Sequence, residues 1–270
     1  MSHPLPLLHP FPWPVEPSVG IPVLITGAVY LRGWGRLRRR VPQRFDVRHA
    51  AVFLAALVTM LLTLSSPVDT MAHRWLSAHM VQHLLLMMVV APMLWMGAPV
   101  APLLVGLPQF LRKIVLAAAN APASRRLTRW LLHPSTGWVA FALAFWVWHA
   151  PALYDLAFDS DLWHHTEHAC FLVSALLFWR PVILAWPARV TWPRWAMIPY
   201  LALAMFQSLP LAVILTFSDR VIYTRYSSVD DQALAGLIMW VPGSLPLLLP
   251  MLRLIVDLSS ERVPMEGHHA

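Results

Sequence analysis

The chain alternates between long apolar segments and shorter polar ones that hold most of its charge. Seven apolar segments can be marked, at residues 18–31, 49–65, 77–97, 137–149, 165–184, 195–217 and 233–256. A helix needs about 20 apolar residues to cross the hydrocarbon core of a bilayer. Most of the segments meet this length, and the first and fourth are short unless flanking residues extend them. The pattern predicts an all-α polytopic membrane bundle of seven transmembrane helices.

The basic residues between the segments predict the orientation of the bundle. Of the 20 lysines and arginines, all but Arg74, Arg220 and Arg225 lie after the odd-numbered segments. Because positive loops stay in the cytoplasm, we expect the N-terminus outside and the C-terminus inside. The chain then divides into a proline-rich extracytoplasmic segment (1–17), a seven-helix transmembrane domain (18–256) and a cytoplasmic C-terminal tail (257–270).

The composition supports this class and excludes others. Hydrophobic residues make up 58% of the chain and charged residues only 12%, about half the charged share of a soluble domain. The net charge of +7 is confined to short loops, which is typical of membrane topology and not of nucleic-acid binding. Cys170 is the only cysteine, so an intrachain disulfide or a CxxC metal site is excluded.

Histidines gather at the predicted outer ends of three segments. His79 and His83 open the third segment, His149 closes the fourth, and His164 and His168 open the fifth. The spacing of each pair is i,i+4, which puts both imidazoles on one helix face. A single histidine at a membrane interface is usually explained by local hydrogen bonds. Five at one depth predict a functional site, because polar groups inside a membrane are costly.

The residue types of this cluster predict a metal site. Neutral imidazoles favour copper, zinc, iron or haem. The thioethers of Met80 and Met87 lie close by in the third segment and are possible soft ligands, which tilts the choice toward Cu(I). Methionines in such helices are more often packing residues than ligands. We therefore expect a copper ion, with haem as the alternative cofactor.

Three acidic or amide residues are further candidates for the predicted site. Glu167 lies within the sequence HHTEH, beside the His164/His168 face. It is predicted to orient an imidazole or accept a proton, unless it only stabilises the start of its helix. Asp231 and Gln232 open the seventh segment, where an aspartate is also a good helix cap. HHTEH lacks the HExxH order of zinc proteases, and we expect a protein without catalytic residues, not an enzyme.

At these residues the sequence resembles the CtaG-type cytochrome c oxidase assembly factors, a bacterial family of seven-helix membrane proteins. The matching stretches are HMVQHLLLMMVVAPMLWMGAP (79–99), WHAPALYDLAF (148–158), HHTEHACFLVSALLFWRPV (164–182) and DQALAGLIMWVPGS (231–244). The resemblance implies a multi-pass protein of the bacterial plasma membrane that matures the terminal oxidase, plausibly by handling copper. It implies oxidase subunits and an extracytoplasmic copper carrier as partners. The positions that match the functional cluster are His79, His83, His149, His164, Glu167 and His168.

Two other functions remain open from the sequence. In a b-type membrane cytochrome, two imidazoles such as His83 with His149 or His168 would ligate a haem. A metal or proton transporter would need polar residues that continue toward the cytoplasm, where Gln207 and Ser208 are the main ones. The favoured interpretation is a non-enzymatic assembly factor that binds copper at its outer face.

Overall fold

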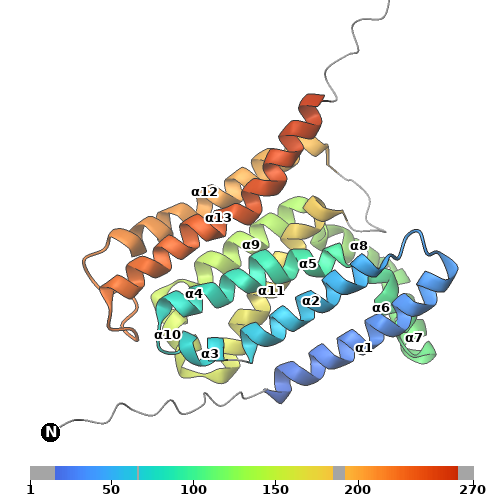
Figure 1. Ribbon diagram of the computed structural model, residues 1–270, viewed down its shortest axis with the longest axis horizontal. Helices are drawn as coiled ribbons and strands as arrows, with labels where there is room; N and C mark the ends of the chain where they lie inside the picture. The colour runs from blue at the N-terminus through green and yellow to red at the C-terminus, as the bar shows by residue number, and fades with distance from the viewer. Residues whose placement is uncertain (1–15, 66, 185–191, 261–270) are drawn as a thin grey trace, which may run out of the picture.

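The computed structural model describes residues 16–65, 67–184 and 192–260, and all regular secondary structure in these residues is helical. In Figure 1, α12 and α13 lie along one edge of the molecule and α1 along the opposite edge, with the other long helices between them. The all-α prediction is confirmed for this part of the chain.

The helices follow one another with short connections. In chain order they are α1 (Pro17–Arg40), α2 (Val47–Leu64), α3 (Pro67–Ala72), α4 (Leu76–Leu84), the π-helix η1 (Leu85–Val90), α5 (Ala91–Met96), α6 (Val100–Gly106), α7 (Gln109–Asn120), α8 (Pro122–Leu131), α9 (Pro134–Trp148), α10 (Pro151–Asp159), α11 (Asp161–Ile183), the 3-10 helix η2 (Arg194–Ala196), α12 (Met197–Phe217) and α13 (Val229–Ser260).

Each of the seven predicted segments coincides with a helix or a continuous helical unit. Four units are long and apolar enough to cross a membrane, namely Val47–Leu64, Leu76–Met96, Arg194–Phe217 and Val229–Ser260. A fifth is added if α9 and α10, which meet at an angle of 76°, count as one broken span. Helices α1 and α11 have 24 and 23 residues but are not among these candidates. The fold is therefore that of a membrane protein, and the count of seven spans stays a prediction.

The predicted domain limits fall close to helix ends but not on them. Pro17 already belongs to α1, and residues 1–15 lie outside the described part of the chain. At the other end α13 continues through Ser260. Its residue Asp257 forms an ion pair with Arg194 at 3.0 Å. The boundary predicted after residue 256 therefore falls inside a helix.

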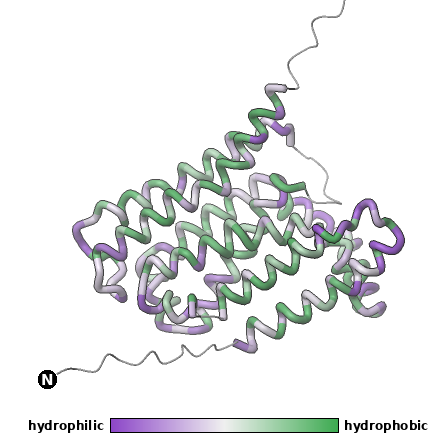
Figure 2. Tube along the Cα trace, in the orientation of Figure 1, coloured by the Kyte–Doolittle hydropathy of each residue, from purple (hydrophilic) through white to green (hydrophobic). Residues whose placement is uncertain are grey.

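Apolar side chains face outward as well as inward. Figure 2 shows hydrophobic residues along the helices and hydrophilic residues gathered at the connecting loops. Leu24 and Phe217, for example, are 70% and 71% exposed. In water such surfaces would be unfavourable, whereas lipid tails solvate them. The outward apolar surface is what a bilayer-embedded bundle requires.

The interior is built largely from aromatic side chains of α9, α11 and α12. Phe141, Phe178 and Tyr200 stack on one another, with centroid distances of 4.4 and 4.8 Å. The Trp179 indole donates a hydrogen bond of 2.8 Å to the carbonyl of Met87, which lies inside η1. A π-turn of this kind commonly accompanies a functional site. Here it follows directly after His83.

Asp231 joins the N-terminal ends of α13 and α4. Its carboxylate accepts hydrogen bonds from the Leu76 amide at 2.6 Å and from both the amide and the hydroxyl of Ser77. It therefore caps α4, and the expectation that it caps its own helix is wrong. That role falls to Ser228, whose hydroxyl accepts from the Asp231 amide at 3.1 Å. The cap fixes the helix that carries His79 and His83.

Gln232 also has a structural explanation. Its side-chain oxygen accepts a hydrogen bond from the Ile222 amide at 2.7 Å, and its nitrogen donates to the Arg220 carbonyl at 3.0 Å. These bonds fold the α12–α13 connection back onto α13. Neither Asp231 nor Gln232 points to a metal.

Helices α1 and α6 pack with their backbones in contact. A Cβ atom added at Gly33 would lie 1.8 Å from the Pro102 carbonyl oxygen, and one added at Gly106 would lie 1.8 Å from the Val29 carbonyl oxygen. Only glycine allows this approach, and small residues at crossing points are the usual device in membrane bundles.

We predict that Gly33→Ala destabilises the protein. The added methyl group overlaps a backbone carbonyl that has no freedom to move away, and such overpacking costs about 1–3 kcal/mol. Thermal unfolding of the purified protein in detergent would measure the loss.

Gly35→Ala in the same helix is the matched control, because nothing lies within 4 Å of its added Cβ. It should be neutral or stabilise the helix by about 0.5–1 kcal/mol through its better helix propensity. Equal unfolding temperatures for the two variants would contradict the proposed contact.

Candidate metal centre

Three helices bring five imidazoles together, four of them buried and that of His164 half-buried. His79 and His83 come from one face of α4, His164 and His168 from the first turns of α11, and His149 from the end of α9. Within each helical pair the ring centroids are 4.2 and 4.3 Å apart. The two pairs face each other, since the centroid distance is 5.7 Å from His79 to His164 and 5.4 Å from His83 to His168. The His149 ring is 6.3 Å from that of His83.

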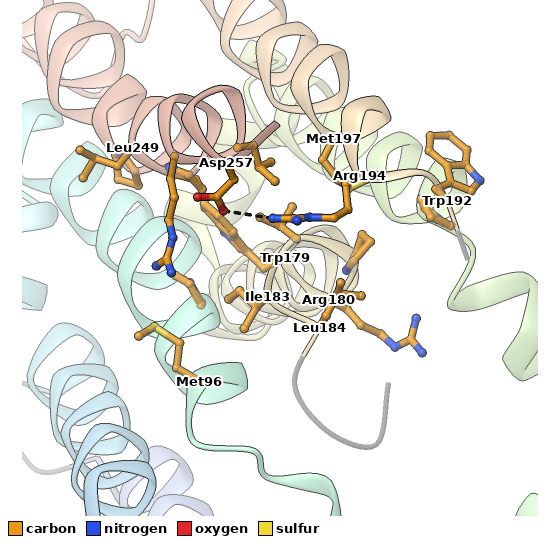
Figure 3. A pocket seen from close by; sticks show the side chains of 18 of the residues that line it. Met96, Trp179, Arg180, Ile183, Leu184, Trp192, Arg194, Met197, Leu249 and Asp257 are labelled. Atoms are coloured by element: carbon orange, nitrogen blue, oxygen red, sulfur yellow. Dashed lines mark hydrogen bonds and ion pairs between the residues drawn. The ribbon is translucent and has the colours of Figure 1, made fainter. Parts of the chain in front are cut away.

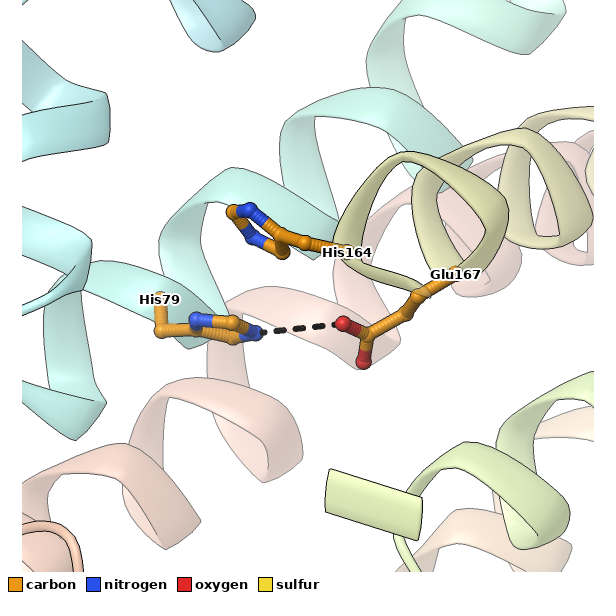
Figure 4. Close-up of side chains that lie close together, drawn as sticks. All are labelled: His79, His164 and Glu167. Carbon is orange, nitrogen blue, oxygen red and sulfur yellow. Dashed lines mark ion pairs between the residues drawn. The ribbon is translucent and has the colours of Figure 1, made fainter. Parts of the chain in front are cut away.

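Glu167 lies among these histidines and not beside them. Its side chain is 1% exposed, and its two oxygens approach His79 Nε2 at 3.9 Å and His83 Nε2 at 3.6 Å. Figure 4 shows the carboxylate turned toward His79, with His164 on the neighbouring turn of the same helix. Helical spacing alone had placed Glu167 off the His164/His168 face. Because α4 packs against that flank of α11, the carboxylate meets the imidazoles of the other helix.

His79, His164 and Glu167 form the set that best fits a metal ion. One candidate ligand atom from each lies within 4.8 Å of the other two. Ligand atoms around one tetrahedral zinc-sized ion are about 3.4 Å apart, so the three side chains would have to move closer together by up to about 1.4 Å to bind it. The donors are nitrogen and oxygen, which suit zinc and copper ions.

Most of the cluster lacks hydrogen-bond partners. The buried atoms without one in the described part of the chain include His79 Nε2, both ring nitrogens of His83, His149 Nε2, His164 Nε2, Glu167 Oε2 and His168 Nε2. A buried polar group left unpaired costs about 1–3 kcal/mol. So many in one place can be satisfied by a bound ligand or by water, and the residues fit a metal ion.

Tyrosines close the cluster on the side of α10. The Tyr154 ring lies 5.3 Å from that of His79. The Tyr226 hydroxyl donates its proton to the Ala72 carbonyl, so Tyr154 must be the donor in the 2.9 Å bond between the two hydroxyls. Tyr223 donates to the carbonyl of His149 at 2.8 Å. Burial raises the pKa of Tyr223 and Tyr226, which keeps both in their neutral, hydrogen-bonding form.

Gln82 is a supporting residue that the sequence reasoning missed. It is fully buried, and its amide nitrogen donates to the Thr63 carbonyl at 2.9 Å and to Asp69 Oδ1 at 2.8 Å. These bonds tie α4 to α2 and α3 and so set the rotation of the helix that carries His79 and His83. The available signal was its place inside HMVQH, three residues after His79.

A pocket of about 460 Å³ borders the cluster at the end of the bundle where α1 and α11 begin. It lies between α1, α2 and α11, and its polar lining residues are Glu16, Ser18, Asp69, His73, Asp161, His164, His165 and His168. His73 is 5.3 Å from His164 between ring centroids, at the outer edge. The Nε2 atom of His165 lies 2.9 Å from Glu16 Oε1, and its Nδ1 is hydrogen-bonded to the Asp161 carbonyl. His165 is thus tied to its neighbours, whereas His73 borders the site.

The two candidate methionines lie on a different side of His83. Met80 and Met87 line a separate cavity of about 50 Å³ together with His83 and His149. They are not part of the His79, His164 and Glu167 set.

A larger pocket of about 740 Å³ lies at the opposite end of the bundle. Figure 3 shows its labelled residues, including Trp179, Arg180 and the Arg194–Asp257 pair. No histidine lines it among the described residues, so its size does not make it the metal centre.

The chain was also compared with known proteins. Uncharacterized proteins from Mycobacterium bovis and Mycobacterium tuberculosis are each 27% identical to it over 265 residues, and one from Mycobacterium leprae is 24% identical over 266 residues. These alignments cover 91% of this chain but only 39% of each relative, so the chain spans about two fifths of their length. No solved structure matches significantly.

The family comparison covers the candidate centre and nearly all of the helical region. The model of the cytochrome c oxidase caa3 assembly factors (Caa3_CtaG) matches residues 28–261, which include all five clustered histidines and Glu167. The chain belongs to the cytochrome c oxidase caa3 assembly factor family.

Proposed function

We propose that this protein binds a copper ion at the outer ends of α4 and α11 and supports the maturation of a metal centre in cytochrome c oxidase. The observation that carries the proposal is the set of buried His79, half-buried His164 and buried Glu167, whose ligand atoms lie within 4.8 Å of one another. The protein acts as a metal-handling chaperone and not as an enzyme, with oxidase subunits as its partners.

The membrane arrangement supports such a role. We propose seven spans in a bacterial plasma membrane, formed by α1, α2, the α4–η1–α5 unit, α9, α11, α12 and α13, with the N-terminus outside. Helices α1 and α11 then cross despite their polar residues, and in α11 the side chains of Glu167 and His168 are buried in the interior. The candidate centre lies at the extracytoplasmic level, where a copper carrier would deliver its ion.

A metal ion would reach the centre through the outer pocket. The carboxylates of Glu16, Asp69 and Asp161 line it and attract a cation from the extracytoplasmic side. His73 borders His164 and is the first imidazole that such an ion would meet. His83 and His168 complete the surroundings of the bound ion.

The alternative functions have less support. The cavity between His83 and His149 has about 50 Å³. Cofactor pockets usually have about 300–1,000 Å³, so a haem does not fit there. A transporter would need a polar route past the aromatic core of Phe141, Phe171 and Phe178, each at most 2% exposed.

We predict that the purified wild-type protein retains copper and that a His79→Ala/His164→Ala/Glu167→Gln variant loses most of it. The three changes remove every ligand of the proposed set while Glu167→Gln preserves shape. Elemental analysis of both proteins in the same detergent would measure the metal per chain, and absorption spectra would detect haem.

His133→Ala is the control for this experiment. His133 lies before α9 against Trp192, away from the cluster, so its loss should leave the copper content unchanged. Equal copper in all three proteins, or iron with a Soret band, would refute the copper site.

In cells that lack the endogenous protein, the same ligand variant should fail to restore caa3-type oxidase activity. The wild type and His133→Ala should restore it, because copper delivery depends on the cluster. Oxidase activity and membrane levels of each variant should be measured together. Full restoration by the ligand variant at a normal level would show that the cluster is not needed for assembly.

A further inference from the structure

A second, chemically different cavity lies directly beyond His83. It has a volume of about 50 Å³ and lies between α4, η1, α9, α12 and α13. Its polar and sulfur-bearing lining residues are Met80, His83, Met87, Met88, His149, Gln207, Ser208 and Met239. Met80, Met87 and Met239 are buried, with 1%, 6% and 7% exposure. A water molecule needs about 10–15 Å³ of such space, so the cavity holds a small ligand and no organic cofactor.

His149 presents a lone pair to this cavity. Its Nδ1 lies 2.7 Å from the carbonyl oxygen of Phe145, one helical turn earlier, and a carbonyl can only accept. Nδ1 must therefore carry the proton. In a neutral ring this leaves Nε2 as the basic atom, and Nε2 is buried without a partner in the described residues. A backbone bond of this kind is the usual way in which proteins fix a metal-binding imidazole.

Other polar atoms around the cavity also lack partners. Both ring nitrogens of His83 and both side-chain amide atoms of Gln207 are buried and unpaired in the part of the chain that the structure describes. Each such group is costly in an apolar surrounding. The wall is otherwise made of apolar groups and thioethers, including Leu84, Phe141, Phe145 and Leu247. The donors that remain are imidazole nitrogen, amide and methionine sulfur.

We infer that this cavity is a second metal site that takes a soft monovalent ion, Cu(I), between His149, His83 and the thioethers of Met80 and Met239. The inference rests on the proposed function, because it takes copper as the bound ion. It assigns copper binding to two sites, an outer site at His79, His164 and Glu167 and an inner site in this cavity. Thioethers are neutral, soft ligands that bind Cu(I) and discriminate against Zn²⁺ and other hard ions. The outer set of two imidazoles and a carboxylate has no such selectivity.

His83 lies between the outer site and the inner site. One of its nitrogens faces Glu167 in the outer set, and its ring is 6.3 Å from that of His149 in the inner one. Met80 and Met239 come from α4 and α13 and pack in the same cluster of buried side chains. An ion that leaves the outer ligands therefore reaches the inner ones by exchanging ligands at His83, with no change of oxidation state.

The test is X-ray absorption of the full-length protein in detergent, loaded anaerobically with Cu(I). Wild type should bind about two ions per chain, and its spectrum should contain sulfur scatterers. Met80→Leu/Met239→Leu keeps the volume but removes the sulfur ligands, so it should bind about one ion, coordinated by nitrogen and oxygen only.

Met71→Leu/Met96→Leu is the matched control, because both methionines are exposed and line no part of this cavity. It should retain the sulfur signal and the second ion. Elution as a monodisperse peak and retention of the outer ion by the Met80→Leu/Met239→Leu protein would verify its fold. Should that protein be misfolded, His149→Ala, which should also lose the second ion, replaces it.

Absence of sulfur scattering from the wild type, or its persistence in the Met80→Leu/Met239→Leu protein, would overturn the inference and leave a water-filled cavity. The proposed function fails on a separate measurement, the loss of oxidase activity when the outer ligands are replaced. Sulfur-bound Cu(I) in a protein that oxidase assembly does not need would refute that function and leave the inner site standing.

Discussion

The arrangement of the site depends on the cost of burying the Glu167 carboxylate inside an apolar bundle. An ionised carboxylate with no partner is among the least favourable groups in such a surrounding. Glu167 is nonetheless 1% exposed and is approached by two imidazoles at 3.6 and 3.9 Å. These distances exceed those of normal hydrogen bonds. The imidazoles therefore do not hydrogen-bond the carboxyl group, and the cation of the proposed function would supply the missing partner.

The scaffold around Glu167 limits how far its neighbours can move. Asp231 caps α4 from α13, and Gln82 ties α4 to α2 and α3. The bonds of Tyr226 and Tyr223 to the carbonyls of Ala72 and His149 hold the connections that flank the cluster. All of these side chains are buried and use neutral or capping hydrogen bonds, which are stronger in a dry interior.

The sequence predicted the histidine cluster because two local rules sufficed. Helical spacing put His79 with His83 and His164 with His168, and the positions of the basic residues brought both pairs to one membrane level. The role of Glu167 and the capping by Asp231 could not be predicted this way, since both depend on how α4 is rotated against α11 and α13. The same rotation separates Met80 and Met87 from the outer ligands, although all of them belong to one helical unit. The number of membrane spans is also not fixed by hydropathy, because α11 carries the polar residues of the site.

One helical unit presents two kinds of ligand on two of its faces. Met80, His83, Leu84 and Met87 have the i, i+3, i+4, i+7 spacing of one α-helical face, and the π-helix η1 follows the first three of them. In the observed arrangement Met80, His83, Leu84, Met87 and Met88 all reach the inner cavity, while His79 faces Glu167. The Trp179 bond to the Met87 carbonyl holds that turn. On the proposed function and the inferred second site, the unit presents the imidazole of His79 to the outer site and thioethers to the inner cavity. Cu(I) binds both types of ligand.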